Sequence, residues 1–230
     1  LDYWKDISSE RYPNGLPKPY SDDPTQWFFH GHPKPSTDPL QVAVARLVGY
    51  AWPVELDSNL EVSEDGRYWI SRSGQLSRHA DIDGIVCIPA IGEELSAADR
   101  LLNLLADAYG DTWSNETLAQ LLASADHAGK SLETWLREKF FTQHGKKFNS
   151  TPFVWQIWDG LRDGFSALVN YHKLDYKTLE ALIYTYLGDW IRQQEAGVRD
   201  RIDGAPTRLA AAQDLKRRLE LILEGEQPYD

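Results

Sequence analysis

The spacing of apolar residues along the chain predicts a mostly helical protein. The clearest pattern covers residues 176–195, where apolar side chains recur every three or four positions. Polar residues that suit helix N-caps precede several similar segments. The expected helices begin at Asp38 and end by Trp52, begin at Ser96, at Asn115 and at Ser131, and run from about Pro206 to Leu223. In the last of these, Ala212–Ile222 form an apolar seam that can pack on a neighbouring helix or start a short coiled coil.

A period of two replaces the helical period around residues 152–172. Apolar and aromatic residues alternate on both sides of a loop that is rich in glycine and aspartate, which predicts a β-hairpin. A short apolar run, Ile85–Ile88, ends at Pro89 and is expected to be a buried strand. Because two strands alone are marginal in water, other elements must cover them. The predicted fold class is therefore mainly α with a small β component (α+β), with a hairpin at about 152–173.

The N-terminal residues 1–39 differ from the rest of the chain. They contain seven of the twelve prolines together with seven aromatic side chains. Proline disfavours long helices, whereas a flexible linker carries few aromatics. We expect a proline-rich arm at 1–39 that its aromatic residues pin to the body or to a neighbouring domain. Residues 40–230 are expected to form a helical domain with the hairpin, with a candidate sub-boundary near 127–150.

Composition narrows the class of protein. The chain has 230 residues, of which 42% are apolar and 26% charged, as in globular domains with a real core. No apolar run approaches the length of a membrane span, so no membrane partner is expected. The single cysteine, Cys87, excludes an internal disulfide and favours a cytoplasmic location. Methionine is absent and the first residue is Leu1, so we interpret the chain as a fragment of a longer protein.

The net charge of −11 is spread unevenly. Residues 54–126 carry 4 basic and 14 acidic side chains, whereas residues 127–230 carry 15 of each. A domain that binds nucleic acid unaided more often has a basic surplus. The acidic middle segment is expected to be a solvated surface, with a basic partner as the alternative.

The sequence contains no recognisable catalytic motif. The patterns of serine hydrolases, zinc proteases and dinucleotide-binding folds are absent, as is the Asn-Pro-Pro-aromatic motif of amino-methyltransferases. Gly129-Lys130-Ser131 lacks the upstream glycine of a phosphate-binding loop, so Ser131 is better explained as a helix cap. No catalytic, cofactor-binding or metal-ligating residue is therefore predicted, and this fragment alone is not expected to be an enzyme.

Two further clusters contain side chains that metal binding or acid–base chemistry could use. His30-Gly31-His32 offers two metal ligands, but no third ligand stands at a usual spacing. Asp81, Asp83, Glu93 and Glu94 are close only in sequence and are expected in a solvated loop.

The stretch from Lys139 to Lys173 is the most suggestive of function. Basic residues position phosphates and aromatic residues stack on bases, and here the two kinds are interleaved. The alternative is a hairpin with tryptophans in the core and lysines in solvent. The candidate DNA contacts are Lys139, His144, Lys146, Lys147, Arg162, His172 and Lys173, among the aromatics Phe153, Trp155, Trp158 and Tyr171.

Six long strings of the sequence are distinctive: Pro19–Pro33, Ser36–Gln41, Pro152–Gly160, Asp163–Leu174, Thr185–Ile191 and Leu219–Glu226. They resemble segments of large bacterial S-adenosyl-methionine-dependent DNA adenine-N6 methyltransferases of restriction–modification and of BREX- and DISARM-type phage defence.

In that family these segments follow the methyltransferase core. The resemblance therefore implies a parent enzyme that uses S-adenosyl-methionine on double-stranded DNA, and a non-catalytic C-terminal auxiliary domain here that assists DNA binding or target positioning. This fragment is expected to hold no cofactor. The alternative is a structural or protein-interaction domain that docks the missing core or other defence proteins through residues 54–126 and the seam Ala212–Ile222.

Overall fold

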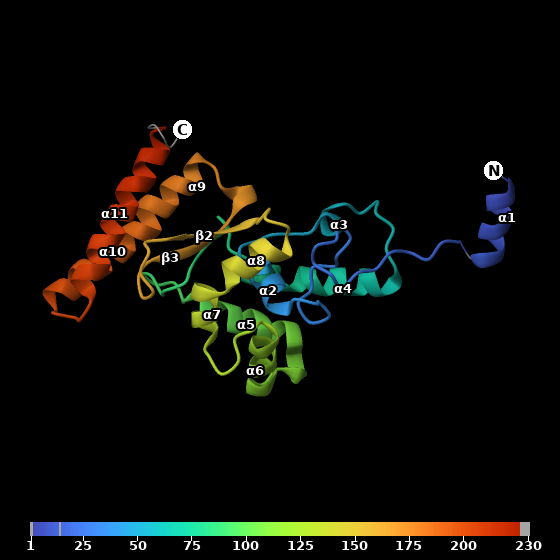
Figure 1. The fold of residues 1–230 in the computed structure, drawn as a ribbon, viewed down its shortest axis with the longest axis horizontal. Coiled ribbons are helices and arrows are strands. Elements are labelled where there is room, and N and C mark those ends of the chain that lie inside the picture. The colour runs from blue at the N-terminus through green and yellow to red at the C-terminus, as the bar shows by residue number, and fades with distance from the viewer. Residues whose placement is uncertain (1, 14, 226–230) are drawn as a thin grey trace.

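A three-stranded antiparallel sheet lies between two groups of helices in the computed structural model, which describes residues 2–13 and 15–225 (Figure 1). Strand β3 (Ser166–Asn170) is central, with β1 (Ile85–Cys87) on one side and β2 (Val154–Trp158) on the other. Leu168 lies opposite Val86 and Gln156. The predicted hairpin and the predicted strand at Ile85–Ile88 are both confirmed, and together they form one sheet.

The two faces of the sheet cover different cores. Val86, Val154 and Leu168 are buried against the first helical group. Cys87 and Val169 are buried against the C-terminal helices. Because side chains alternate along a strand, a strand with both faces covered is buried at every position, as all five residues of β3 are. The fold is mainly α with this small sheet, as predicted.

The first helical group packs around α2, whose residues Leu40–Leu47 are all buried. Serine hydroxyls begin two of its helices as predicted: Ser96 accepts a hydrogen bond from the Asp99 N–H, and Ser131 accepts one from the Thr134 N–H. The helices of this group are α2 (Pro39–Leu47), α3 (Pro53–Leu56), α4 (Glu64–Gln75), α5 (Ala97–Tyr109), α6 (Asn115–Ser124), α7 (Leu132–Glu138) and α8 (Phe140–Lys147), with 3-10 turns η1 (Leu76–His79) and η2 (Gly110–Thr112).

Two details of this group differ from the prediction. Ser114 rather than Asn115 caps α6, because its hydroxyl accepts the Thr117 N–H. The helix expected from Ser131 through Phe140 is interrupted at Lys139, which separates α7 from α8. This break turns the chain at the edge of the sheet.

The C-terminal group is a pair of long helices that lie side by side (Figure 1). A 3-10 turn η3 (Tyr171–Lys173) leads into α9 (Tyr176–Glu180), a π-helical segment η4 (Ala181–Tyr186) and α10 (Leu187–Arg199), and α11 (Ala205–Leu223) returns. The seam residues Ala212, Leu215 and Leu219 are buried in the second core. These three seam residues therefore pack on neighbouring elements of the same chain, whereas Ile222 at the end of the seam is 41% exposed.

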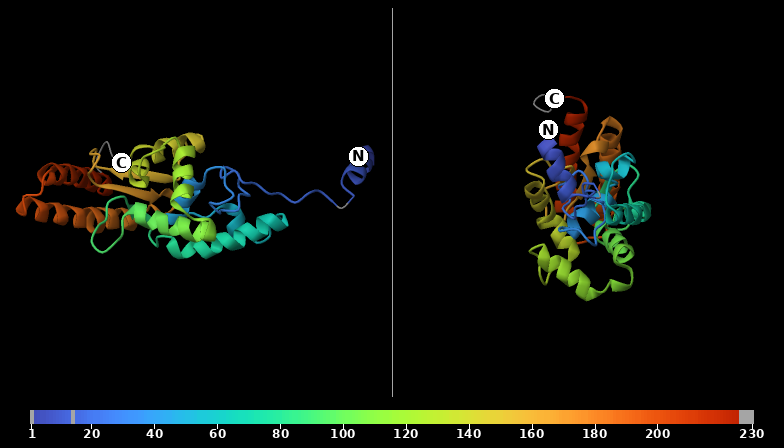
Figure 2. Two further views of the ribbon diagram at one scale, coloured as in Figure 1. Left: turned by 90° about the horizontal axis from the view of Figure 1, so that it is seen from below. Right: turned by 90° about the vertical axis from the view of Figure 1, so that its right-hand side faces the viewer.

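The N-terminal arm is only partly as expected. Residues Asp2–Arg11 form a ten-residue helix, α1, that stands away from the body (Figures 1 and 2), and the sequence pattern did not predict this helix. Of the aromatic residues, Phe29 is fully buried against Trp52 and anchors the arm. Tyr3 and Trp27 are 69% and 54% exposed, so most of the surface of these two rings faces solvent.

No helix within residues 2–13 and 15–225 is both long and apolar enough to cross a bilayer.

Candidate nucleic-acid interface

The seven basic residues predicted to contact DNA separate into two groups. His144 belongs to the interior, with no exposed surface. Its Nδ1 lies 3.1 Å from Gln41 Oε1, and its Nε2 accepts the Val154 N–H at 3.2 Å. Burial lowers its pKa to about 4, so the ring is neutral at pH 7. His144 joins α2, α8 and β2 and cannot reach DNA in this structure.

Lys147 and Lys173 also hold the fold together. Lys147 Nζ pairs with Asp38 at 2.8 Å and with Asp23 at 3.4 Å, which ties α8 to the N-terminal arm. Lys173 Nζ donates to the backbone carbonyls of Asp81 and Ile82 at 3.0 and 3.1 Å. Both ammonium groups are already satisfied, which weakens their assignment as DNA contacts.

Lys139, Lys146, Arg162 and His172 remain accessible. Lys139 pairs with Asp126 at 3.1 Å, but that carboxylate is 87% exposed, and such surface pairs contribute little. Lys146 and Arg162 are exposed, and neither forms an ion pair within the described part of the chain. These side chains can exchange solvent for phosphate.

Lys139 and Arg162 line the same cavity, of about 450 Å³, at the open edge of β2. We call it the α7–β2 cleft. One wall comes from the junction of α7 and α8, and the other from β2 and the loop that follows it. Its lining residues are Arg137, Glu138, Lys139, Phe141, Thr142, Gln156, Trp158, Leu161, Arg162 and Ser166.

Asp159 shapes the loop that presents Arg162. Its carboxylate is buried and accepts the N–H groups of Leu161 and Phe165 at 3.0 and 2.8 Å. Arg137 donates to the Gly164 carbonyl at 3.1 Å and so fixes α7 to the same loop. The cleft walls are thus held by hydrogen bonds that the sequence pattern did not reveal.

Trp158 is the aromatic residue that the prediction and the cleft share. It is 50% exposed, so its indole face is open to a ligand. Lys146 lies one helical turn beyond Thr142, on the same side of α8 as the cleft. Phe141, Thr142, Gln156 and Arg137 were missed from the sequence. The polar Gln156 at an inward position of an apolar strand was the only signal for them.

His172 lies in a different hollow. It lines three cavities of about 350, 590 and 340 Å³, which we call the His172 groove. Its ring lies 5.7 Å from that of Tyr50, which in turn stacks on Phe153 at 3.9 Å. Apart from His172 itself, Lys173 is the one basic residue in the groove's lining, which is mainly aromatic and apolar.

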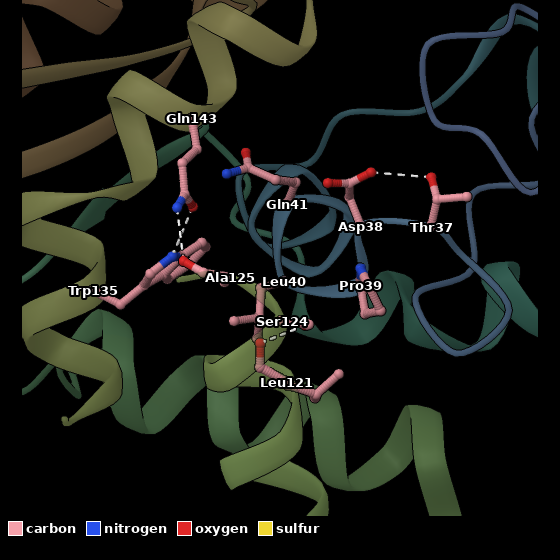
Figure 3. Close-up of a pocket in the computed structure, with 10 residues that line it drawn as sticks. All are labelled: Thr37, Asp38, Pro39, Leu40, Gln41, Leu121, Ser124, Ala125, Trp135 and Gln143. Carbon is pink, nitrogen blue, oxygen red and sulfur yellow. Dashed lines mark hydrogen bonds between the residues drawn. The ribbon is translucent and has the colours of Figure 1, made fainter. Parts of the chain in front are cut away.

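A smaller cavity of about 250 Å³ lies between α2, α6 and α8 (Figure 3). Trp135 Nε1 donates to Gln143 Oε1 at 2.9 Å, and Gln143 Nε2 donates to the Ala125 carbonyl at 2.7 Å. Asp38 accepts from Thr37 and from Lys147. These polar groups bind one another, so the cavity offers few free partners to a ligand.

His30-Gly31-His32 is part of the interior. Both imidazoles are 1% exposed, and each Nδ1 accepts a backbone N–H two residues onward. Burial lowers their pKa values to about 4 and about 3. A Cβ on Gly31, at φ +76°, would lie 2.5 Å from a carboxylate oxygen of Glu55. The motif packs against a buried ion pair.

That ion pair joins Arg46 of α2 to Glu55 of α3. Arg46 Nη1 lies 2.8 Å from both Glu55 oxygens, and Nη2 donates to the Ser73 carbonyl at 2.8 Å. The side chains are 7% and 8% exposed. Burial raises the pKa of Glu55, and Arg46 and the Trp52 N–H oppose that rise.

Of the four carboxylates expected in a solvated loop, Glu93 and Glu94 are exposed, whereas Asp81 and Asp83 are held by contacts within the fold. Asp81 is 12% exposed and accepts Arg100 Nη2 at 2.8 Å. Asp83 accepts the Tyr186 hydroxyl at 2.8 Å, which links the sheet to η4. Burial and the neighbouring Asp81 carboxylate raise the pKa of Asp83 to about 6. Within the described residues, no group of three or more His, Cys, Asp or Glu side chains could hold a metal ion.

Comparison of the sequence with protein-family models and with curated proteins finds no match.

Proposed function

We propose that this chain is a non-catalytic DNA-positioning domain of a larger DNA adenine-N6 methyltransferase. The observation that carries the proposal is the α7–β2 cleft, where Lys139 and Arg162 line the same cavity as the half-exposed Trp158. Cations bind phosphate oxygens and aromatic rings accept bases, and nucleic acid offers both groups together. The family resemblance supplies the parent activity, including its S-adenosyl-methionine, which the missing core would bind.

The domain would add phosphate contacts to those of the core and hold duplex DNA in register. Such contacts carry no sequence information, and they weaken as the salt concentration rises, because the counterions that the protein releases from DNA then gain less free energy. The net charge of −11 means that only a local face is suited to DNA. That face comprises Lys139, Lys146 and Arg162, with His172 at a separate place.

The test is duplex binding by fluorescence anisotropy over a salt series. The variant Lys139→Ala/Lys146→Ala/Arg162→Ala removes three positive charges from the cleft side. The control Lys177→Ala/Arg192→Ala/Arg199→Ala removes three exposed charges from α9 and α10.

We expect the cleft variant to lose affinity about 10-fold or more near 100 mM salt and to show a shallower salt slope by about 1–3. The control variant should bind DNA as tightly as the unsubstituted chain does. Equal losses of affinity in both variants, or no salt-sensitive DNA binding by the unsubstituted chain, would contradict the proposal.

A second candidate function rests on the His172 groove. Leu56 and Tyr171, which line it, are 76% and 54% exposed. Exposed apolar surface of this kind marks protein contact sites. In this alternative the groove docks the methyltransferase core, or another defence protein, without contact to DNA. Leu56→Ser/Tyr171→Ser would then weaken binding to the core and leave DNA binding unchanged.

A further inference from the structure

The α7–β2 cleft has the wrong size for a duplex and the right size for one nucleotide. Its volume of about 450 Å³ lies in the range of about 300–1,000 Å³ that small-ligand sites occupy. A duplex can lie only across its rim. A ligand that fills the cleft must therefore be about the size of a single nucleotide.

The lining selects a planar group that carries a negative charge. The exposed indole of Trp158 and the ring of Phe141 suit a flat aromatic face. Lys139 and Arg162 suit a phosphate, and Arg162 can offer its guanidinium in bidentate fashion. A nucleotide is the biological unit that joins a planar ring to a phosphate.

Uncharged backbone groups of β2 face the cleft and suit hydrogen bonding to the edge of a base. The Phe153 carbonyl accepts the Tyr171 N–H, and the Asp159 N–H donates to the Phe165 carbonyl. The backbone groups of Phe153 and Asp159 therefore face β3. Alternation along an antiparallel strand then points the backbone groups of Gln156 and Trp158 away from β3, toward the cleft. The Val154 N–H points the same way, to His144.

Glu138 also lines the cleft. A carboxylate repels a simple polyanion, but it accepts hydrogen bonds from the exocyclic amino group of a base. The lining is therefore better matched to a base with its phosphate than to phosphate alone.

We propose that the α7–β2 cleft binds one unpaired nucleotide of a DNA strand, with the base against Trp158 and the phosphate toward Arg162 and Lys139. This inference rests on the proposed function, since it assumes that DNA passes the open edge of β2. A free mononucleotide has the same chemistry, and the experiment separates the two sources.

The test compares three probes with the full chain at one salt concentration. They are a fully paired duplex, the same duplex with one bulged adenosine, and free deoxyadenosine monophosphate as ligand and as competitor. We expect the bulged duplex to bind about 5-fold or more tighter than the paired one. Competition by the free mononucleotide should require a far higher concentration than competition by the bulged strand.

Trp158→Ala should weaken binding of the bulged duplex about 5- to 100-fold, the range that loss of one base–aromatic stack gives. It should change binding of the paired duplex less than 2-fold, and Trp158→Phe should restore most of the preference. Trp27→Ala is the matched control, because Trp27 is 54% exposed and lies outside the cleft. Trp158 is half-exposed, so its loss should leave the circular dichroism spectrum unchanged.

Three results would overturn the proposal that the cleft binds an unpaired nucleotide. Paired and bulged duplexes bound equally, with no effect of Trp158→Ala, would overturn the cleft proposal and leave DNA positioning intact. Tight binding of free mononucleotide without strand binding would overturn it in favour of a small-molecule site. Absence of binding to all three probes would overturn the proposed function together with this inference.

Discussion

Substitution of Glu55 by Gln should destabilise the fold strongly, because it leaves the Arg46 guanidinium buried without a counter-charge. Arg46 is 7% exposed, and two of its short contacts are to the Glu55 oxygens. The Trp52 N–H also donates to Glu55 Oε2, at 2.8 Å. A glutamine amide has one acceptor oxygen, and Arg46 Nη1 contacts both oxygens of Glu55, so Arg46 faces an NH₂ group in either orientation of the amide and the Trp52 N–H does so in one of them.

Removal of one partner of a buried pair costs about 3–5 kcal/mol. Gln preserves the shape of Glu and also removes the cost of burying the Glu55 charge, which raises the pKa of that carboxyl, so we expect the low end of this range, about 3 kcal/mol, for Glu55→Gln at pH 7. With a urea m-value of about 3 kcal/mol/M, the unfolding midpoint should fall by about 1 M. Far-UV circular dichroism during urea titration measures this shift.

Glu61→Gln is the matched control. Its carboxylate is 79% exposed and lies 4.0 Å from Lys18, so its loss should cost less than about 0.5 kcal/mol. Replacement of both partners, in Arg46→Met/Glu55→Leu, should recover part of the lost stability, because no unpaired charge remains. Equal midpoints for Glu55→Gln and Glu61→Gln would refute the assignment of Arg46 and Glu55 as a buried ion pair.

The remaining predictions concern pH. Burial lowers the pKa values of His30, His32 and His144 to about 4, 3 and 4. As the pH falls below about 6.5, the unfolded chain therefore takes up protons before the folded chain does. Stability is therefore fully present above about pH 6.5 and lost toward pH 4. His144→Gln should reduce that loss by up to about 1.4 kcal/mol per pH unit, as measured by urea midpoints at several pH values. Asp83 has the opposite sign: its raised pKa of about 6 means that its ionisation destabilises the fold as pH rises through 6. Asp83→Asn should therefore raise stability by about 1 kcal/mol near pH 8, and the gain should shrink toward pH 4; a gain that does not vary with pH would contradict this.

Local patterns along the chain were sufficient to predict most of the elements. The alternation on both sides of Asp159–Gly164 predicted the hairpin, and the serines at 96 and 131 marked helix starts that the structure confirms. These features depend on residues that are neighbours in sequence, where periodicity and capping act. The break at Lys139 and the π-helical segment in 181–186 were not foreseen, because packing against the sheet and α11 decides them.

The candidate interface was predicted only in outline. The stretch Lys139–Lys173 does contain the cleft residues Lys139, Trp158 and Arg162. It also contains His144, which resembles a surface cation in sequence yet lies fully buried against Gln41 and Val154. Charge and aromatic content identify candidates, but they do not state which side of an element faces water.

The sequence by itself determined the helical class, the hairpin, the uneven charge and the absence of catalytic motifs. Only the tertiary structure decided which basic residues are free. Lys147 and Lys173 are held by Asp38 and by the carbonyl of Asp81, which lie more than ninety residues away along the chain. Such partners are set by how the sheet and the two helical groups pack. That packing is a property of the whole chain, because burial and ion pairing depend on distance in space rather than on order in sequence.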